Sequence, residues 1–194
     1  MNDIEISNIA LIHCGIVDTI SSFEDASEEA GVISTVFDTV KLSMLAEYPW
    51  NFAVEWSNLS PLVAVPGNPD FEYQFQLNST YLRVIAVVDE YGHPLDWAYE
   101  ANNRICANVN NIKVKYLKNV TTTDLPAYFA NALAAKLATQ IVIALTEDVG
   151  KLNLLMGMYQ RLDAKAKLLD MKSNPPPTVI STSNSRLIQS RYTH

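Results

Sequence analysis

The chain has 194 residues, of which 48% are hydrophobic and 18% are charged, which is the composition of a globular protein and not of a disordered one. Its formal charge of −7 argues against broad binding to nucleic-acid phosphates, because that binding requires clustered lysine and arginine. The two cysteines belong to no CxxC or Cys/His cluster, so we expect buried free thiols in a soluble, reducing compartment. The length fits one domain, or one domain with a substantial subdomain.

The periodicity of the hydrophobic residues changes twice along the chain. Residues 3–50 and 123–172 repeat apolar residues at helical spacing, whereas residues 51–120 alternate at period two. This pattern predicts an α+β fold in which an antiparallel β-sheet domain is inserted into a four-helix bundle.

The boundaries of these parts follow from the same pattern. We expect the helical bundle to comprise residues 1–53 and 121–172, and the inserted β domain to comprise residues 54–120. Residues 173–194 are rich in proline, serine and threonine and have no helical period, so they are predicted to form an extended C-terminal arm.

Start and stop signals place the first two helices. The first spans residues 4–14 and ends at Gly15, where a left-handed cap is favoured. The second has Ser27 as its N-cap and ends before Pro49, because the residue before a proline is pushed out of helical geometry. Its predicted buried face contains Ala30, Ile33, Phe37, Val40 and Met44.

The third predicted helix begins at a cap, Thr123 or Asp124, with Pro126 in its first turn. Its apolar stretch, 127–145, is alanine-rich and interrupted by polar residues, so we expect the central buried helix of the bundle and not a membrane span. The fourth helix has an apolar seam at heptad spacing, formed by Leu152, Leu155, Tyr159, Leu162, Ala166 and Leu169.

The middle region has the features of antiparallel strands. Residues 71–77 alternate aromatic or apolar with polar side chains, which is typical of a strand with one buried face. Residues 91–94 and several asparagine pairs mark tight turns. The sequence therefore predicts five or six short strands that form a meander or a small sandwich.

Side chains suited to catalysis or metal binding are few and scattered. His13, His93 and His194 have no second histidine, cysteine or carboxylate at metal-ligand spacing, and the six glycines form no phosphate-binding loop. We therefore predict no catalytic residue, no cofactor and no metal. The alternative interpretation is an α+β enzyme or small-ligand-binding protein with a pocket near Trp97, His93 and Asp96.

The predicted arm differs in charge from the rest of the chain. No acidic residue follows Asp170, and residues 173–194 carry only two charged side chains, both arginines. An acidic body with a basic extended end is suited to reaching a neighbouring subunit or a partner. The expected partner-binding residues are Arg186, Leu187, Ile188, Arg191 and Tyr192.

Several segments, taken in order, resemble the tail tubular protein A family of short-tailed phages, whose members are head-to-tail adaptor or gatekeeper proteins. The resemblance extends over nearly all of residues 5–172. The segments that carry it are Asn8–Leu11, Glu47–Ala53, Phe71–Leu77, Tyr81–Val84, Trp97–Glu100, Arg104–Ile105 and Ala132–Ala138.

The resemblance implies a structural virion protein and not an enzyme. Its members form a ring, twelve-fold in this family, between the portal protein and the tail nozzle protein, through which the genomic DNA passes without specific binding. It also implies assembly in the host cytoplasm, a final location at the portal vertex of the virion, and no membrane partner. For this chain it makes the portal, or an adjacent subunit, the expected target of the arm.

Overall fold

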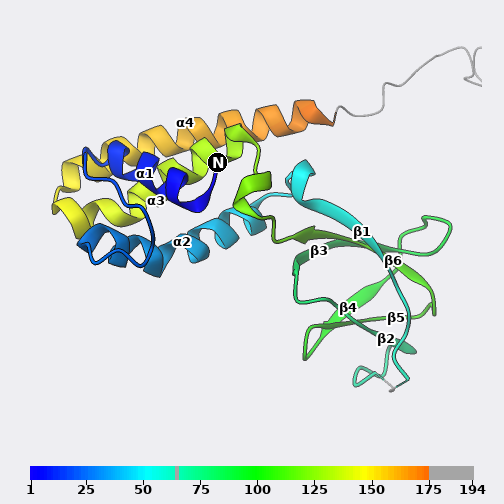
Figure 1. Ribbon diagram of the computed structural model, residues 1–194. Coiled ribbons are helices and arrows are strands. Elements are labelled where there is room, and N and C mark those ends of the chain that lie inside the picture. The colour runs from blue at the N-terminus through cyan, green and yellow to red at the C-terminus, as the bar shows by residue number, and fades with distance from the viewer. Residues whose placement is uncertain (64–65, 175–194) are drawn as a thin grey trace, which may run out of the picture.

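The computed structural model describes residues 1–63 and 66–174 and combines four α-helices with two small antiparallel sheets (Figure 1). The α+β class predicted from the sequence is therefore confirmed. The α-helices and 3-10 helices are α1 (Asp3–His13), α2 (Glu28–Glu47), η1 (Asn51–Ala53), η2 (Thr122–Asp124), α3 (Ala127–Thr146) and α4 (Val149–Ser173). The strands are β1 (Val54–Leu59), β2 (Tyr73–Gln76), β3 (Tyr81–Val88), β4 (Trp97–Glu100), β5 (Arg104–Ala107) and β6 (Ile112–Lys118).

The four α-helices, here called the helical layer, pack around α3, which contacts α1, α2 and α4. Small side chains on α3 let its neighbours approach closely, and Ala130, Ala134 and Ala138 are fully buried. Among the described residues, α3 alone has the length and hydropathy of a membrane span, but 56% of that window is buried inside the protein. The prediction of a central buried helix is confirmed.

The ends of α1 and α2 follow their predicted signals. The hydroxyl of Ser27 accepts a hydrogen bond from the Ala30 N–H at 3.2 Å, and Gly15 adopts a φ of 78° directly after α1. All five residues of the predicted α2 face are buried. Local spacing and capping were therefore sufficient to define these two helices.

The predicted start of the third helix is wrong. Neither Thr123 nor Asp124 caps α3, because both belong to the separate 3-10 turn η2, and Pro126 is the N-cap residue. Leu125 is extended, with φ −70° and ψ 131°, as expected for a residue before proline. The helix therefore cannot continue backward through Leu125 to those polar residues.

The predicted seam of the fourth helix is confirmed in its middle and wrong at its end. Leu155 and Ala166 are buried, and the residues between them on the seam are partly buried. Leu169, however, is 37% exposed, while the next residue, Asp170, is fully buried. At this end of α4 the buried side of the helix therefore includes Asp170 in place of Leu169.

The six strands form a small sandwich, here called the β sandwich, with sheet orders β1-β6-β3 and β2-β5-β4. Both sheets are antiparallel throughout. Phe75 and Ile105 from one sheet share a single core with Val84 and Val114 from the other. The Tyr99 hydroxyl accepts a hydrogen bond from the Val84 N–H at 3.0 Å, which joins the two sheets directly.

Trp50 occupies the point where the chain passes from α2 into the β sandwich. Its side chain is fully buried, and its indole N–H donates to the Met44 carbonyl at 3.0 Å. Its ring meets Phe129 of α3 edge to face, with centroids 4.9 Å apart. The start of the β sandwich is thereby fixed to the core of the helical layer, while the sandwich projects to one side (Figure 1).

Candidate interaction surface

The expected partner-binding residues, Arg186, Leu187, Ile188, Arg191 and Tyr192, lie outside the described residues. The structure does describe the end of the helix that precedes them. Helix α4 ends at Ser173, and Asn174 is its C-cap. The position of this helix end relative to the other described residues is therefore defined.

A buried carboxylate holds that end of α4 in place. The side chain of Asp170 accepts hydrogen bonds from the Asn51 N–H at 2.9 Å and from the Tyr128 hydroxyl at 3.0 Å. The Asn51 side-chain amide donates to the Asp170 carbonyl at 2.7 Å. Burial, together with the neighbouring Asp170 carboxylate, raises the pKa of Tyr128 to about 12, so the phenol keeps its proton and remains a donor.

This anchor joins three parts of the molecule. Asn51 belongs to η1 at the start of the β sandwich, Tyr128 belongs to the first turn of α3, and Asp170 belongs to the last turn of α4. A carboxylate in such a place is stable only when its oxygens are hydrogen-bonded. The contacts of Asp170 therefore account for its burial and give it a structural role.

The solvent-facing side of α4 combines cations with apolar side chains. Leu154, Arg161, Lys165, Leu168 and Lys172 recur at intervals of seven, four, three and four residues, which places them along one stripe of the helix. Leu154 is 75% exposed and Leu168 is 52% exposed. We call these five residues the α4 stripe.

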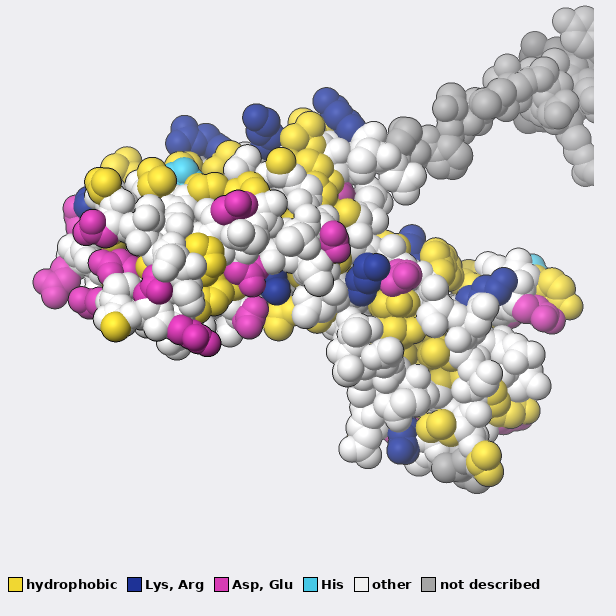
Figure 2. Space-filling model, viewed as in Figure 1, with side chains coloured by type: hydrophobic (Ala, Val, Ile, Leu, Met, Phe, Trp, Pro, Cys, Tyr) yellow, Lys and Arg dark blue, Asp and Glu magenta, His cyan; other side chains and the backbone are white. Residues whose placement is uncertain are grey.

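The opposite side of the helical layer is acidic. Residues 1–47 contain nine aspartates and glutamates but a single lysine, Lys41, and no arginine. The Nζ atom of Lys41 lies 3.5 Å from Oδ1 of Asp38. Figure 2 shows lysine and arginine side chains along the edge formed by α4, and aspartate and glutamate gathered toward the α2 side. The helical layer thus separates its charges, although the whole chain is only moderately acidic.

The separation of charge between the first helices and α4 was not recognised from the sequence. A single net charge for the whole chain hides the difference between the acidic first helices and the basic α4. The signal was present as the run of acids before residue 48 and as the five lysines and arginines of α4. Counting charge separately for each predicted helix would have found it.

The residues of the alternative pocket have local structural roles. The ring nitrogen Nδ1 of His93 lies 2.9 Å from Oδ2 of Asp89, and the His93 N–H donates to Oδ1 of the same carboxylate at 2.8 Å. These contacts close an exposed turn after β3. Trp97 is half-buried and meets Tyr99 edge to face, with centroids 5.0 Å apart. Asp96 is exposed.

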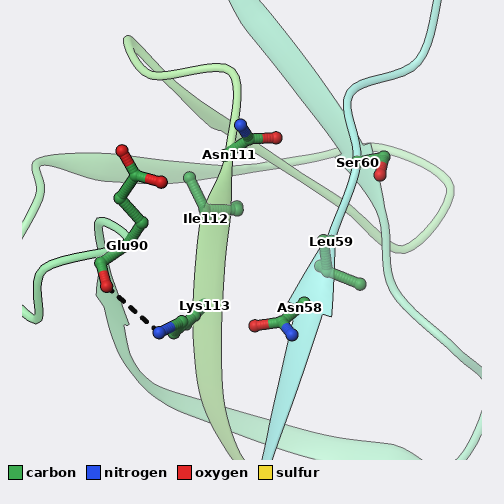
Figure 3. A pocket seen from close by; sticks show the side chains of 7 residues that line it. All are labelled: Asn58, Leu59, Ser60, Glu90, Asn111, Ile112 and Lys113. Atoms are coloured by element: carbon green, nitrogen blue, oxygen red, sulfur yellow. Dashed lines mark hydrogen bonds between the residues drawn. The ribbon is translucent and has the colours of Figure 1, made fainter.

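One open hollow of about 420 Å³ lies at the end of the β1-β6-β3 sheet (Figure 3). Its only cation, Lys113, donates to the Glu90 carbonyl at 3.1 Å. The lining residues are Asn58, Leu59, Ser60, Glu90, Asn111, Ile112 and Lys113. They include no histidine or cysteine, and none of the three alternative-pocket residues lines the hollow.

The two thiols have the properties expected of structural cysteines. Cys14 lies in the helical layer and Cys106 in the β sandwich, and both are buried. Burial raises the pKa of each to about 11, and for Cys106 the Glu100 carboxylate adds to the effect. Within residues 1–63 and 66–174, no group of three or more histidine, cysteine, aspartate or glutamate side chains is placed to hold a metal ion.

Comparison of the sequence with models of known protein families and with curated proteins gives no match. The resemblance to the tail tubular protein A family therefore remains a proposal. The properties that the structure itself contributes are the anchored end of α4 and the separation of charge across the helical layer.

Proposed function

We propose that this protein is a head-to-tail adaptor of a short-tailed phage, one subunit of a ring that joins the portal to the tail nozzle and forms part of the DNA channel. In this proposal α1–α4 act as a four-helix bundle and the β domain is its insertion. The arm, predicted as residues 173–194, is the segment after Ser173, the last residue of α4, and docks on the portal or an adjacent subunit. The ring is twelve-fold, as the resemblance implies. The subunits assemble in the host cytoplasm and end at the portal vertex of the virion.

The observation that carries this proposal is the two-part shape of the subunit. The structure has two distinct hydrophobic clusters: one fills the helical layer and extends to Leu117 of β6, and the other lies inside the β sandwich, which projects from the end of the helical layer (Figure 1). A connector has to contact one protein above and another below, and two rigidly joined bodies provide two such surfaces. The anchor at Asp170 and the packing of Trp50 fix the chain segment that leads into the β sandwich against the helical layer.

The charge of the chain also supports a passage for DNA. A channel wall that held phosphates tightly would impede ejection, and tight holding requires clustered cations. The acidic side chains of residues 1–47 provide no such cluster. The basic α4 stripe is interrupted by two leucines, which suits contact with protein better than contact with a phosphate backbone.

Reconstitution with the portal protein of the same genome tests this function. The full chain, mixed with purified portal, is expected to form a ring visible by negative-stain electron microscopy and a complex of matching mass in native mass spectrometry. A chain that neither binds the portal nor forms a ring on it would contradict the proposal. Deletion of residues 178–194 is the matched variant, since it removes the assigned partner-binding residues and leaves α1–α4 intact.

A further inference from the structure

The two charged sides of the helical layer are complementary to each other, and each lacks a partner of comparable extent within the described part of the subunit. On α2, Glu28, Gly31, Thr35 and Asp38 are exposed and follow one another at intervals of three and four residues. Gly31 and Thr35 are small, and a Cβ added at Gly31 would meet no atom within 4 Å. This face, here called the α2 face, is open enough for another helix to approach.

The outer charges of the two faces have similar spacings. With a rise of 1.5 Å per residue, Glu28 and Asp38 are separated by about 15 Å along α2, and Arg161 and Lys172 by about 16 Å along α4. Between the outer cations of the α4 stripe lie Lys165 and Leu168, and between the acids of the α2 face lie small residues. A helix with long side chains can therefore pack into a helix with short ones while both charged ends find opposite charges.

The two faces also lie in the right places for repetition. Figure 1 places α2 and α4 on opposite sides of α3. A contact between two different surfaces of the same chain is heterologous, and it generates a ring when the rotation between neighbours closes. Self-pairing of either face would instead oppose like charges, which is unfavourable.

We infer that the α4 stripe of one subunit packs on the α2 face of a second copy of this chain. Arg161, Lys165 and Lys172 then face the carboxylates Glu28 and Asp38, while Leu154 and Leu168 lose their exposure to water. This inference rests on the proposed function, because it identifies the faces through which the subunits of the ring meet. It is independent of the arm, which lies outside the described residues.

Reciprocal charge reversal tests the pairing. One variant carries Arg161→Glu and Lys165→Glu on α4, and the other carries Glu28→Lys and Asp38→Lys on α2. Alone, each variant presents two faces of the same sign, so we expect the concentration for half-maximal ring assembly to rise by about tenfold or more. Mixed in equal amounts, the two variants restore opposite charges at every contact, and we expect assembly to return as an alternating ring.

A matched control keeps the charge change but moves it away from both faces. Arg83→Glu with Lys113→Glu alters net charge by the same amount as the α4 variant but lies on the β sandwich. This control is expected to assemble like the parent. A chain with all four α2 and α4 changes is a second test of rescue, and thermal unfolding of each variant verifies that it is folded.

The outcomes separate the inference from the function on which it rests. Assembly lost in each variant and recovered in the mixture supports the pairing. Rings that form on the portal equally well with either variant alone would overturn the pairing and leave the adaptor function standing. Loss in each variant without recovery in the mixture or in the chain with all four changes, in folded proteins, would also overturn it. A parent chain that neither binds the portal nor self-associates would overturn both.

Discussion

The helical layer and the β sandwich carry charges of both signs but arrange them differently. In the sandwich the signs are interleaved: Glu55 of β1 lies 3.3 Å from Lys118 of β6, and the Tyr116 hydroxyl donates to the same carboxylate at 3.1 Å. In the helical layer side-chain ion pairs also form, Lys41–Asp38, Lys136–Glu47 and Lys167–Asp163, but most other acids gather on the α2 side and most other cations on α4. Interleaved charges form ion pairs within one chain, whereas separated charges remain available to pair with a second molecule.

The two regions differ in their cores as well. The core of the helical layer extends through all four helices and includes the aromatic group around Trp50 and Phe129, whereas the core of the sandwich is smaller and centred on Phe75 and Ile105. Because the two cores are distinct, the regions need not lose their structure together. Substitutions in each core measure how far the stabilities of the two regions are coupled.

The largest effect is expected from Phe129→Ala. Phe129 is fully buried and contacts both Trp50 and Phe52, so its removal should lower the free energy of unfolding by about 3–5 kcal/mol. Urea unfolding followed by far-ultraviolet circular dichroism measures the loss. Phe75→Ala is the matched change in the sandwich. If Phe75→Ala shifts the helical signal as much as Phe129→Ala does, the two cores form one cooperative unit and are not energetically distinct.

Asp170→Ala should have the next largest effect, because it leaves the Asn51 N–H and the Tyr128 hydroxyl without their acceptor. A fully buried donor without an acceptor costs about 1–3 kcal/mol, and because both donors here are only partly buried, a combined loss of about 2–3 kcal/mol is expected in the same unfolding experiment. The control is Asp38→Ala, an exposed carboxylate on α2. Equal stability of the two variants would show that the anchor does not join the regions.

Ser27→Ala should cost about 1 kcal/mol, since it removes the hydrogen bond to the Ala30 N–H at the start of α2. Ser34→Ala is a control on the same helix, since its hydroxyl bonds only the Gly31 carbonyl and caps no helix end. Hydrogen exchange is expected to quicken in the first turns of α2 and to stay unchanged in β1–β6. Faster hydrogen exchange in the strands would show that the stability of the sandwich depends on the start of α2.

The smallest effect near neutral pH is expected from the thiols. The pKa values of Cys14 and Cys106 are raised from 9.0 to about 11 in the folded protein, so unfolding releases protons above pH 9. The stabilisation is complete below pH 9 and is lost as the pH rises toward 11. Denaturation midpoints of Cys14→Ser and Cys106→Ser, measured between pH 7 and 11, test this sign, and a midpoint of the parent chain that rises above pH 9 would contradict it.

The fold was predictable from the sequence wherever neighbours along the chain decide it. Ser27, Gly15 and the buried face of α2 act through contacts within a few residues, so their spacing was sufficient. The burial of Asp170 was not predictable, because its acceptor role depends on Asn51, which is 119 residues away in the sequence. The wrong prediction for Leu169 has the same origin: the hydrogen bonds with Asn51 place Asp170 on the buried side of α4, and Leu169 is therefore exposed.

The candidate surface was less predictable than the fold. The stripe on α4 is visible as a helical repeat of charges, but its meaning depends on the acidic α2 lying on the other side of α3, which only the tertiary structure shows. The residues chosen from sequence for partner binding stand in the segment after Asn174, outside the described residues. Their assignment remains a prediction.

The anchor at Asp170 has a mechanical consequence. A tensile load applied to the chain at Asn174 passes within one helical turn into the hydrogen bonds of Asp170 with Asn51 and Tyr128. The load is thereby transferred to η1 and α3 before the contacts between α4 and the other helices can break one turn after another. Rupture then requires several hydrogen bonds to break together, and this gives the protein resistance to force at the end of α4.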